Sequence, residues 1–207
     1  MTSFVVNPGS VHWFRGLIQG KTRIVIAWVF AVLLGFSARS YPSWPGVLLC
    51  FLGAVLRFWA SGYLRKDSRP AVGGPYAWIR NPLYLGTYLM ALGVAGAIGN
   101  WWLLGVSTLI FGVIYHFIIL DEETKLKKIF QKPYVLYCQK VPRFFPKIVP
   151  PFLPTAEVLQ KINPELSHHR FSMKLAMKNK AYEALASFAG LIAYVAAMAY
   201  FWNHGSI

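Results

Sequence analysis

The chain has 207 residues, of which 56% are hydrophobic and only 14% are charged. Soluble domains carry roughly 25% charged residues, so this composition excludes an ordinary soluble protein and indicates an integral membrane protein. The 21 Lys and Arg residues against 7 Asp and Glu give a net charge of +14. Because these basic residues lie between long apolar segments, they indicate cytoplasmic loops and argue against nucleic-acid binding.

Five apolar segments follow one another along the chain, at residues 24–38, 45–64, 82–98, 101–120 and 182–202. Each approaches the ~20 residues that a helix needs to cross a hydrocarbon layer of about 30 Å. We therefore predict an all-α, polytopic membrane protein of about five transmembrane helices. Amphipathic cytoplasmic helices are expected between the fourth and fifth segments. Residues 1–207 are expected to form one domain.

The basic residues also predict an orientation. Three precede the first segment, four lie between the second and third, and twelve lie between the fourth and fifth, so that 19 of the 21 share one side. The positive-inside rule then places the N-terminus and these loops in the cytoplasm and the C-terminus outside. An active site built from these loops would face the cytoplasm.

Small residues repeat along the third segment, at Gly93, Gly96 and Gly99, and along the last. The last segment's set is Ala186, Ala189, Gly190, Ala193 and Ala197. Small side chains let membrane helices approach closely, so we expect both sets to pack against other helices, within one chain or between chains. The oligomeric state stays open.

The two cysteines, Cys50 in an apolar segment and Cys138 in a basic loop, have no metal-ligand spacing. We therefore expect neither a metal site nor a disulfide.

A short helix is expected to continue from the fourth segment over residues 121–131. On a period of 3.6 residues, Glu122, Leu126 and Ile129 share one face, which predicts that Glu122 is the buried carboxylate. Glu123 lies at the edge of this face, where an ion pair with Lys127 at i+4 is possible.

The loop before the third segment ends in a predicted helix start. Asn81 is a favoured N-cap residue and Pro82 a favoured first helical residue. Tyr76, Arg80 and Tyr84 cluster about this helix start. Its free N–H groups and partial positive charge suit a carboxylate or a phosphate, so we expect a ligand site there.

Two further sets of residues allow two interpretations each. Tyr134, Tyr137 and Arg143 lie in a basic, aromatic segment, which is either an interfacial anchor or part of the site. Arg57 lies within the second segment, about two turns from its cytoplasmic end. Its charge either snorkels to the interface or faces a substrate cavity.

Taken together, three motifs occur in a fixed order. Gly-Pro-Tyr-x-Trp-x-Arg-Asn-Pro-x-Tyr-x-Gly covers residues 74–86, Glu-Glu-x-x-Leu covers 122–126, and Phe130, Tyr134 and Tyr137 precede Val-Pro-Arg-Phe at 141–144. In this order and spacing they resemble the isoprenylcysteine carboxyl methyltransferase and phospholipid methyltransferase superfamily of membrane enzymes. The resemblance covers residues 57–146, and the helix at 182–202 is an addition to the prenylcysteine enzymes' pattern.

The resemblance implies an enzyme that uses S-adenosylmethionine without a Rossmann domain. It would transfer a methyl group to a lipophilic or lipid-anchored acceptor, at a carboxylate, a thiol or a headgroup amine. Glu122 would hold ribose hydroxyls, for which a carboxylate is suited, and Gly86 would let the ligand approach the helix backbone. The implied cofactor-binding residues are Tyr76, Arg80, Asn81, Pro82, Leu83, Tyr84, Gly86, Glu122 and Glu123, and the candidate catalytic residues are Arg143, Arg57 and Tyr137.

This chain departs from the family pattern at two positions. Asn81 stands where the family usually has His, and it cannot titrate near neutral pH. Ile118 stands where the prenylcysteine enzymes have an Arg that would suit a substrate carboxylate, so the resemblance does not fix the acceptor.

Two other functions fit parts of the pattern. One is an NADPH-dependent membrane enzyme similar to the sterol reductases. The other is a non-enzymatic membrane scaffold whose motifs are only helix caps and anchors.

Overall fold

The computed structural model describes residues 29–30, 32–65, 70–146, 156–164 and 170–205, and their regular structure is entirely helical. A short helical segment lies within residues 29–37. The later elements are α3 (Trp44–Ser61), the 3₁₀ turn η1 (Gly74–Ala77), α4 (Pro82–Ile98), α5 (Trp101–Lys140), α6 (Ala156–Ile162), α7 (Met173–Lys178) and α8 (Tyr182–His204). The predicted all-α class is thus confirmed.

Three helices, α3, α5 and α8, are long and apolar enough to cross a membrane, and α4 is a shorter apolar helix of 17 residues. The chain is therefore an integral membrane protein. The beginning of the first predicted segment, residues 24–28, lies outside the described residues, as does residue 31. The count of five spans and the orientation accordingly stay predictions.

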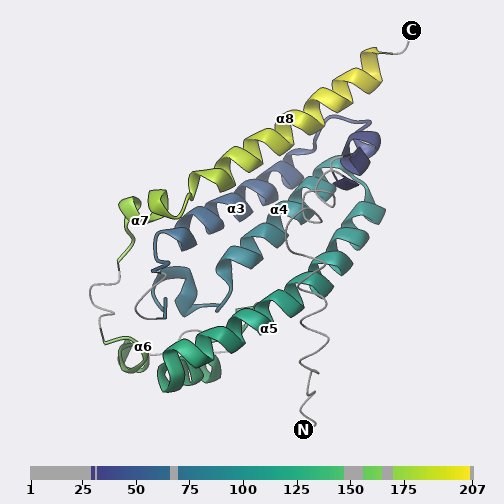
Figure 1. The fold of residues 1–207 in the computed structure, drawn as a ribbon. Helices are drawn as coiled ribbons and strands as arrows, with labels where there is room; N and C mark the ends of the chain where they lie inside the picture. The colour runs from purple at the N-terminus through teal and green to yellow at the C-terminus, as the bar shows by residue number, and fades with distance from the viewer. Residues whose placement is uncertain (1–28, 31, 66–69, 147–155, 165–169, 206–207) are drawn as a thin grey trace.

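The long helices run side by side, with α3 between α8 and α4, and with α5 on the far side of α4 (Figure 1). Their shared core includes Cys50 and Ala54 of α3, Met90 and Val94 of α4, and Val195 of α8. The short elements η1, α6 and α7 lie together at one end of this bundle (Figure 1). The loops that carry the sequence motifs are therefore gathered at one end.

Close contact between α3 and α4 depends on small residues. A Cβ atom on Gly93 would lie 2.3 Å from the backbone nitrogen of Cys50, and one on Gly46 would lie 2.2 Å from that of Ala97. Gly96, by contrast, has nothing within 4 Å of its Cβ position. The packing role is confirmed for Gly93, whereas Gly96 meets no neighbour among the described residues of this chain.

The small residues predicted to pack along the last segment lie on the exposed side of α8. Ala186, Ala189, Gly190, Ala193 and Ala197 are all exposed. The buried residues of α8 are instead Ala184, Val195 and Ala199. Within the described residues, these five exposed side chains therefore do not form the contact between α8 and α3.

The turn between α4 and α5 is tight. Gly99 ends α4 in the left-handed region, with φ of 72°, a conformation that glycine adopts without steric cost. Asn100 then caps α5 by accepting a hydrogen bond from the N–H of Leu103 at 3.0 Å. Trp101 and Trp102 are more than 80% exposed at this end, as expected for residues at a membrane interface.

Helix α5 continues well beyond its apolar part and then bends. Gln131 has φ of 50° and ψ of −130°, and Pro133 follows inside the helix. Proline removes a backbone hydrogen bond and clashes with the preceding turn, so a bend here is expected. The limb after the bend packs with α6 in a second apolar cluster that contains Val72, Tyr134 and Tyr137.

Candidate active site

Two loops at this end of the bundle are joined by hydrogen bonds. The N–H of Arg80 donates to the carbonyl of Pro142 at 2.9 Å, and the Asn81 side-chain amide donates to the carbonyl of Arg143 at 2.9 Å. Helix α4 begins at Pro82 as predicted, but the Asn81 side chain makes no capping hydrogen bond. The amide holds the second loop instead, and the first N–H groups of α4 are left without this cap.

The tyrosines of the second motif are part of the core. The Tyr137 hydroxyl donates to the carbonyl of Tyr76 at 2.7 Å, and both side chains are buried, as is Tyr134. Burial raises the pKa of all three phenols well above the usual value. The interfacial-anchor interpretation is therefore wrong for Tyr134 and Tyr137, and the hydroxyl predicted to act in catalysis is used within the fold.

The buried carboxylate of α5 is Glu123 and not Glu122, which corrects the prediction. The Nε and Nη2 atoms of Arg143 each donate to one carboxylate oxygen of Glu123 at 3.0 Å. Arg80 Nη1 lies 3.0 Å from Glu123 Oε1. The Glu123 side chain is 3% exposed, and its hydrogen bonds raise the pKa of the Arg143 guanidinium. The partners of Glu123 are thus two loop arginines, and Lys127 is not one of them.

One N–H donor of the Arg80 guanidinium, at Nε, makes no hydrogen bond to the described residues. The Arg80 side chain is 9% exposed, and this Nε atom is buried. An unpaired buried donor costs about 1–3 kcal/mol. An acceptor atom of a bound ligand would remove that cost.

Glu122, by contrast, is exposed. The hydroxyl of Tyr84, in the first turn of α4, donates to Glu122 Oε2 at 2.8 Å. The carboxylate is therefore oriented from one side while it remains open to solvent. An oriented, accessible carboxylate is suited to accept hydrogen bonds from ligand hydroxyls.

Aromatic rings of α5 support Tyr84, and the sequence analysis missed them. Tyr115 meets the Tyr84 ring edge-on, with centroids 5.1 Å apart, and Phe111 stacks on Tyr115 at 4.0 Å. Phe111 and Tyr115 are four residues apart, which places them on one face of a helix. This spacing was the signal available in the sequence.

Arg57 lies on the other side of α4, toward α3. Its Nη1 donates to the carbonyl of Leu83 at 3.3 Å and to the hydroxyl of Thr87. A Cβ atom on Gly86 would lie 2.6 Å from Arg57 Cγ and 2.7 Å from the carbonyl oxygen of Gly53. Gly86 therefore permits close approach of α3, not of a ligand as predicted, and Arg57 holds the first turns of α4.

Most of the predicted site residues are thus brought together at the N-terminal end of α4 and the adjoining part of α5. Glu122 and Arg80 offer an accessible carboxylate and an unsatisfied cationic donor, close to an uncapped helix N-terminus. Arg57 and Gly86 are on the α3 side of α4. This arrangement can bind a polar ligand that carries both hydroxyl groups and a negative charge.

Comparison with known proteins identifies the family. Residues 41–133 match the phospholipid methyltransferase family. A protein-S-isoprenylcysteine O-methyltransferase of Schizosaccharomyces pombe is 31% identical, over 70% of this chain and 71% of that protein. The nickel-cobalt-cadmium resistance protein NccN of Alcaligenes xylosoxydans xylosoxydans is 27% identical, over 64% of this chain and 58% of its own length. No solved structure matches.

The matched region contains the α3 and α4 helices, the loop between them and the acidic pair of α5. These are the elements that build the site described above. The chain therefore belongs to the isoprenylcysteine and phospholipid methyltransferase superfamily and is a membrane methyltransferase.

Proposed function

We propose that this protein transfers a methyl group from S-adenosylmethionine to a lipophilic acceptor at the cytoplasmic face of the membrane. The observation that carries the proposal is the Glu122 carboxylate, which Tyr84 orients while leaving it accessible. The family assignment favours this reaction over the reductase and scaffold alternatives. The acceptor would be a lipid or a lipid-anchored molecule, and the bilayer would bring it to the site.

The residues present fit the chemical groups of this methyl donor. Glu122 would accept hydrogen bonds from the ribose hydroxyls. The buried, unpaired Nε of Arg80 would donate to the carboxylate of the amino-acid portion, and the N-terminus of α4 would add its partial positive charge. Residues 57–146 would form the methyltransferase core of one domain, and α8 would be an addition to it.

The protein's task in this reaction is alignment. S-adenosylmethionine supplies an electrophilic methyl group because its sulfonium sulfur leaves as a neutral thioether. Holding the acceptor in line with that methyl group can lower the barrier by several kcal/mol. The buried tyrosines, whose pKa values are raised, are not bases at neutral pH. A carboxylate or thiolate acceptor needs no base and therefore suits this site better than a protonated amine.

Tyr137 and Arg143 would act as positioning residues. The first holds the η1 turn through the carbonyl of Tyr76, and the second holds Glu123. Arg57 would likewise position the start of α4 through Leu83. None of the three is then required to touch the reacting atoms.

The direct test is equilibrium binding of S-adenosylmethionine to the detergent-purified protein, with NADPH as the competing ligand class. We expect saturable binding that Glu122→Gln weakens by at least about tenfold, because a ligand hydrogen bond to a charged group contributes about 1.5–3 kcal/mol. Asp121→Asn is the matched control, since Asp121 pairs with the exposed Lys125. Saturable binding of NADPH, with none of S-adenosylmethionine, would contradict the proposal.

A second pair of variants tests the tyrosine. Tyr84→Phe removes the hydroxyl that orients Glu122 and is expected to weaken binding severalfold. Tyr88→Phe removes the hydroxyl one turn further along α4, which contacts Thr108, and should leave binding unchanged. Equal losses in both variants would show that the hydroxyl of Tyr84 has no specific role.

A further inference from the structure

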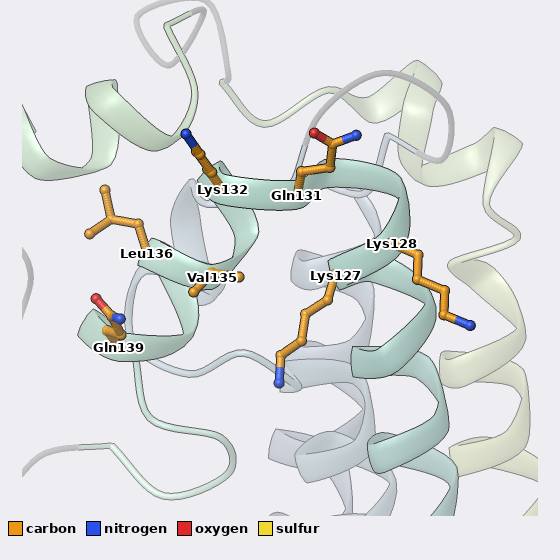
Figure 2. Close-up of a pocket in the computed structure, with 7 residues that line it drawn as sticks. All are labelled: Lys127, Lys128, Gln131, Lys132, Val135, Leu136 and Gln139. Atoms are coloured by element: carbon orange, nitrogen blue, oxygen red, sulfur yellow. The ribbon is translucent and has the colours of Figure 1, made fainter. Parts of the chain in front are cut away.

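The bend of α5 encloses a basic groove that the methyl-donor site does not use. Lys127 and Lys128 lie on the limb before the bend, and Lys132, Val135 and Leu136 lie at or after it. We call this the lysine groove. It is an open groove with a volume of about 530 Å³. Figure 2 shows the two limbs on either side of it, with the Lys127 side chain extending between them.

The three lysines of the groove have no ion-pair partner among the described residues. Every acidic side chain that the structure describes is engaged elsewhere. Asp121 pairs with Lys125, and Glu183 pairs with Lys180. Glu122 and Glu123 belong to the active site. The groove is therefore lined by three lysines whose charges the described part of the chain does not neutralise. Lys127 extends between the two limbs, whereas Lys128 and Lys132 point away from that space (Figure 2).

The position of the groove along α5 relates it to the membrane. At 1.5 Å per residue, the twenty residues from Trp101 to Leu120 span about 30 Å, the thickness of the hydrocarbon layer. Lys127 lies seven residues further on, about 10 Å beyond that layer, at the outer edge of the lipid headgroup region, which is about 5–8 Å thick on each side. Long lysine side chains can reach back toward the headgroups, and in Figure 2 Lys127 is directed along α5 toward its earlier turns.

The surroundings of the lysines are apolar and exposed. Ile129 is 66% exposed and Val135 is 42% exposed. Aliphatic side chains beside lysines are typical of surfaces that lie at a membrane interface. A soluble acidic peptide or a nucleic acid would meet the charges but not this apolar floor.

We propose that the lysine groove binds the headgroup of an anionic phospholipid from the cytoplasmic leaflet. The phosphate would contact Lys127 between the limbs, and the flexible side chains of Lys128 and Lys132 would turn toward it. The glycerol and first acyl carbons would contact Val135 and Leu136. Each lysine near an anionic membrane surface contributes about 1 kcal/mol, which corresponds to roughly fivefold in affinity. This site is separate from the methyl-donor site, so either proposal can fail without the other.

The test uses the full chain in nanodiscs of phosphatidylcholine containing a minor fraction of phosphatidylglycerol. Native mass spectrometry of the released protein then gives the ratio of the two lipids that remain bound. We expect phosphatidylglycerol to be enriched over its bulk fraction on the wild type. The triple variant Lys127→Gln, Lys128→Gln, Lys132→Gln should lose at least about fivefold of that enrichment.

The matched control changes three exposed lysines outside the groove, Lys140→Gln, Lys174→Gln and Lys178→Gln, and should keep the enrichment. Val135→Glu, which puts a negative charge into the groove at an exposed position, should lose it without removing a lysine. Equal enrichment on the wild type and on both groove variants would overturn the proposal. So would an equal loss in the control triple variant, because the effect would then be general surface charge.

Discussion

At the scale of single residues, the two adjacent glutamates of α5 have opposite environments. Glu123 is buried and receives hydrogen bonds from Arg143 and an ion pair from Arg80. Glu122 is exposed, and among the described residues its carboxylate accepts a hydrogen bond from Tyr84. Neighbouring residues on a helix point about 100° apart, so one carboxylate holds the loops together while the other faces outward, where we propose that the methyl donor binds.

This difference predicts that two matched substitutions will reduce the free energy of unfolding by very different amounts. Glu123→Gln removes the charge that neutralises two arginines, and breaking a buried ion pair in this way costs about 3 kcal/mol or more. Glu122→Gln should cost less than about 1 kcal/mol, because the amide can still accept a hydrogen bond at an exposed position. Unfolding midpoints in detergent measure both. Equal midpoints would contradict the role of Glu123 as the buried partner of the two arginines.

The buried tyrosines predict a loss of stability at high pH. Because burial raises the folded-state pKa of Tyr137 above its unfolded value of about 10, its contribution is fully present below pH ~10 and is lost as the pH rises above that value. Tyr137→Phe should lower stability at neutral pH by about 1 kcal/mol and should reduce the further loss at alkaline pH. Unfolding midpoints measured from pH 8 to 11 test this. Parallel curves for the two proteins would contradict it.

At the scale of elements, the contact between α3 and α4 positions the site. Gly86 faces Arg57 and Gly53, whereas Gly96 of the same helix faces open space. Because the start of α4 carries Tyr84, separating these helices would displace the site.

Substitution of these two glycines tests the role of the contact. Gly86→Ala should destabilise the protein by about 1–3 kcal/mol, since it forces backbone and side chain apart. Gly96→Ala should be neutral or stabilising, because alanine favours the helix and meets no neighbour. Thermal unfolding separates the two variants, and donor binding should weaken only in Gly86→Ala. A stable Gly86→Ala protein with full donor binding would contradict this role.

The elements and the site differ in how far the sequence predicts them. Apolar segments and the Asn81-Pro82 helix start predict α3, α4, the first part of α5 and α8, since hydropathy and proline geometry act locally. The bend at Gln131 has a local cause in Pro133, which the sequence analysis did not use. The use of Asn81 to hold Arg143 depends on a partner distant in the sequence. The same reason explains why periodicity chose Glu122 over Glu123 as the buried carboxylate, because the arginines that bury Glu123 lie on two other loops.

At the scale of the whole molecule, the motif-bearing loops gather at one end of a helical bundle (Figure 1). The charge distribution predicts that this end faces the cytoplasm. A cytoplasmic methyl donor and a membrane-embedded acceptor could then reach one site from two phases. The lysine groove lies at the same end of α5 and would fix the depth of that site relative to the headgroups.

The predicted orientation can be tested with single cysteines. In a Cys138→Ser background, Lys140→Cys should react with a membrane-impermeant maleimide only in inverted vesicles. His204→Cys, at the exposed end of α8, should react only in vesicles of native orientation. Cys50 is buried and serves as an unreactive internal standard. Labelling of both positions from the same side would contradict the orientation.

The central claim is that the methyl donor binds between the start of α4 and the acidic pair of α5. The measurement that tests it most directly is ultraviolet cross-linking of methyl-labelled S-adenosylmethionine to the purified protein, followed by peptide mapping. The account predicts that the label falls within residues 70–90 and 111–146, and that excess S-adenosylhomocysteine displaces it. Displaceable label on α8 or on residues 29–37, or no displaceable label on the folded protein, would contradict it.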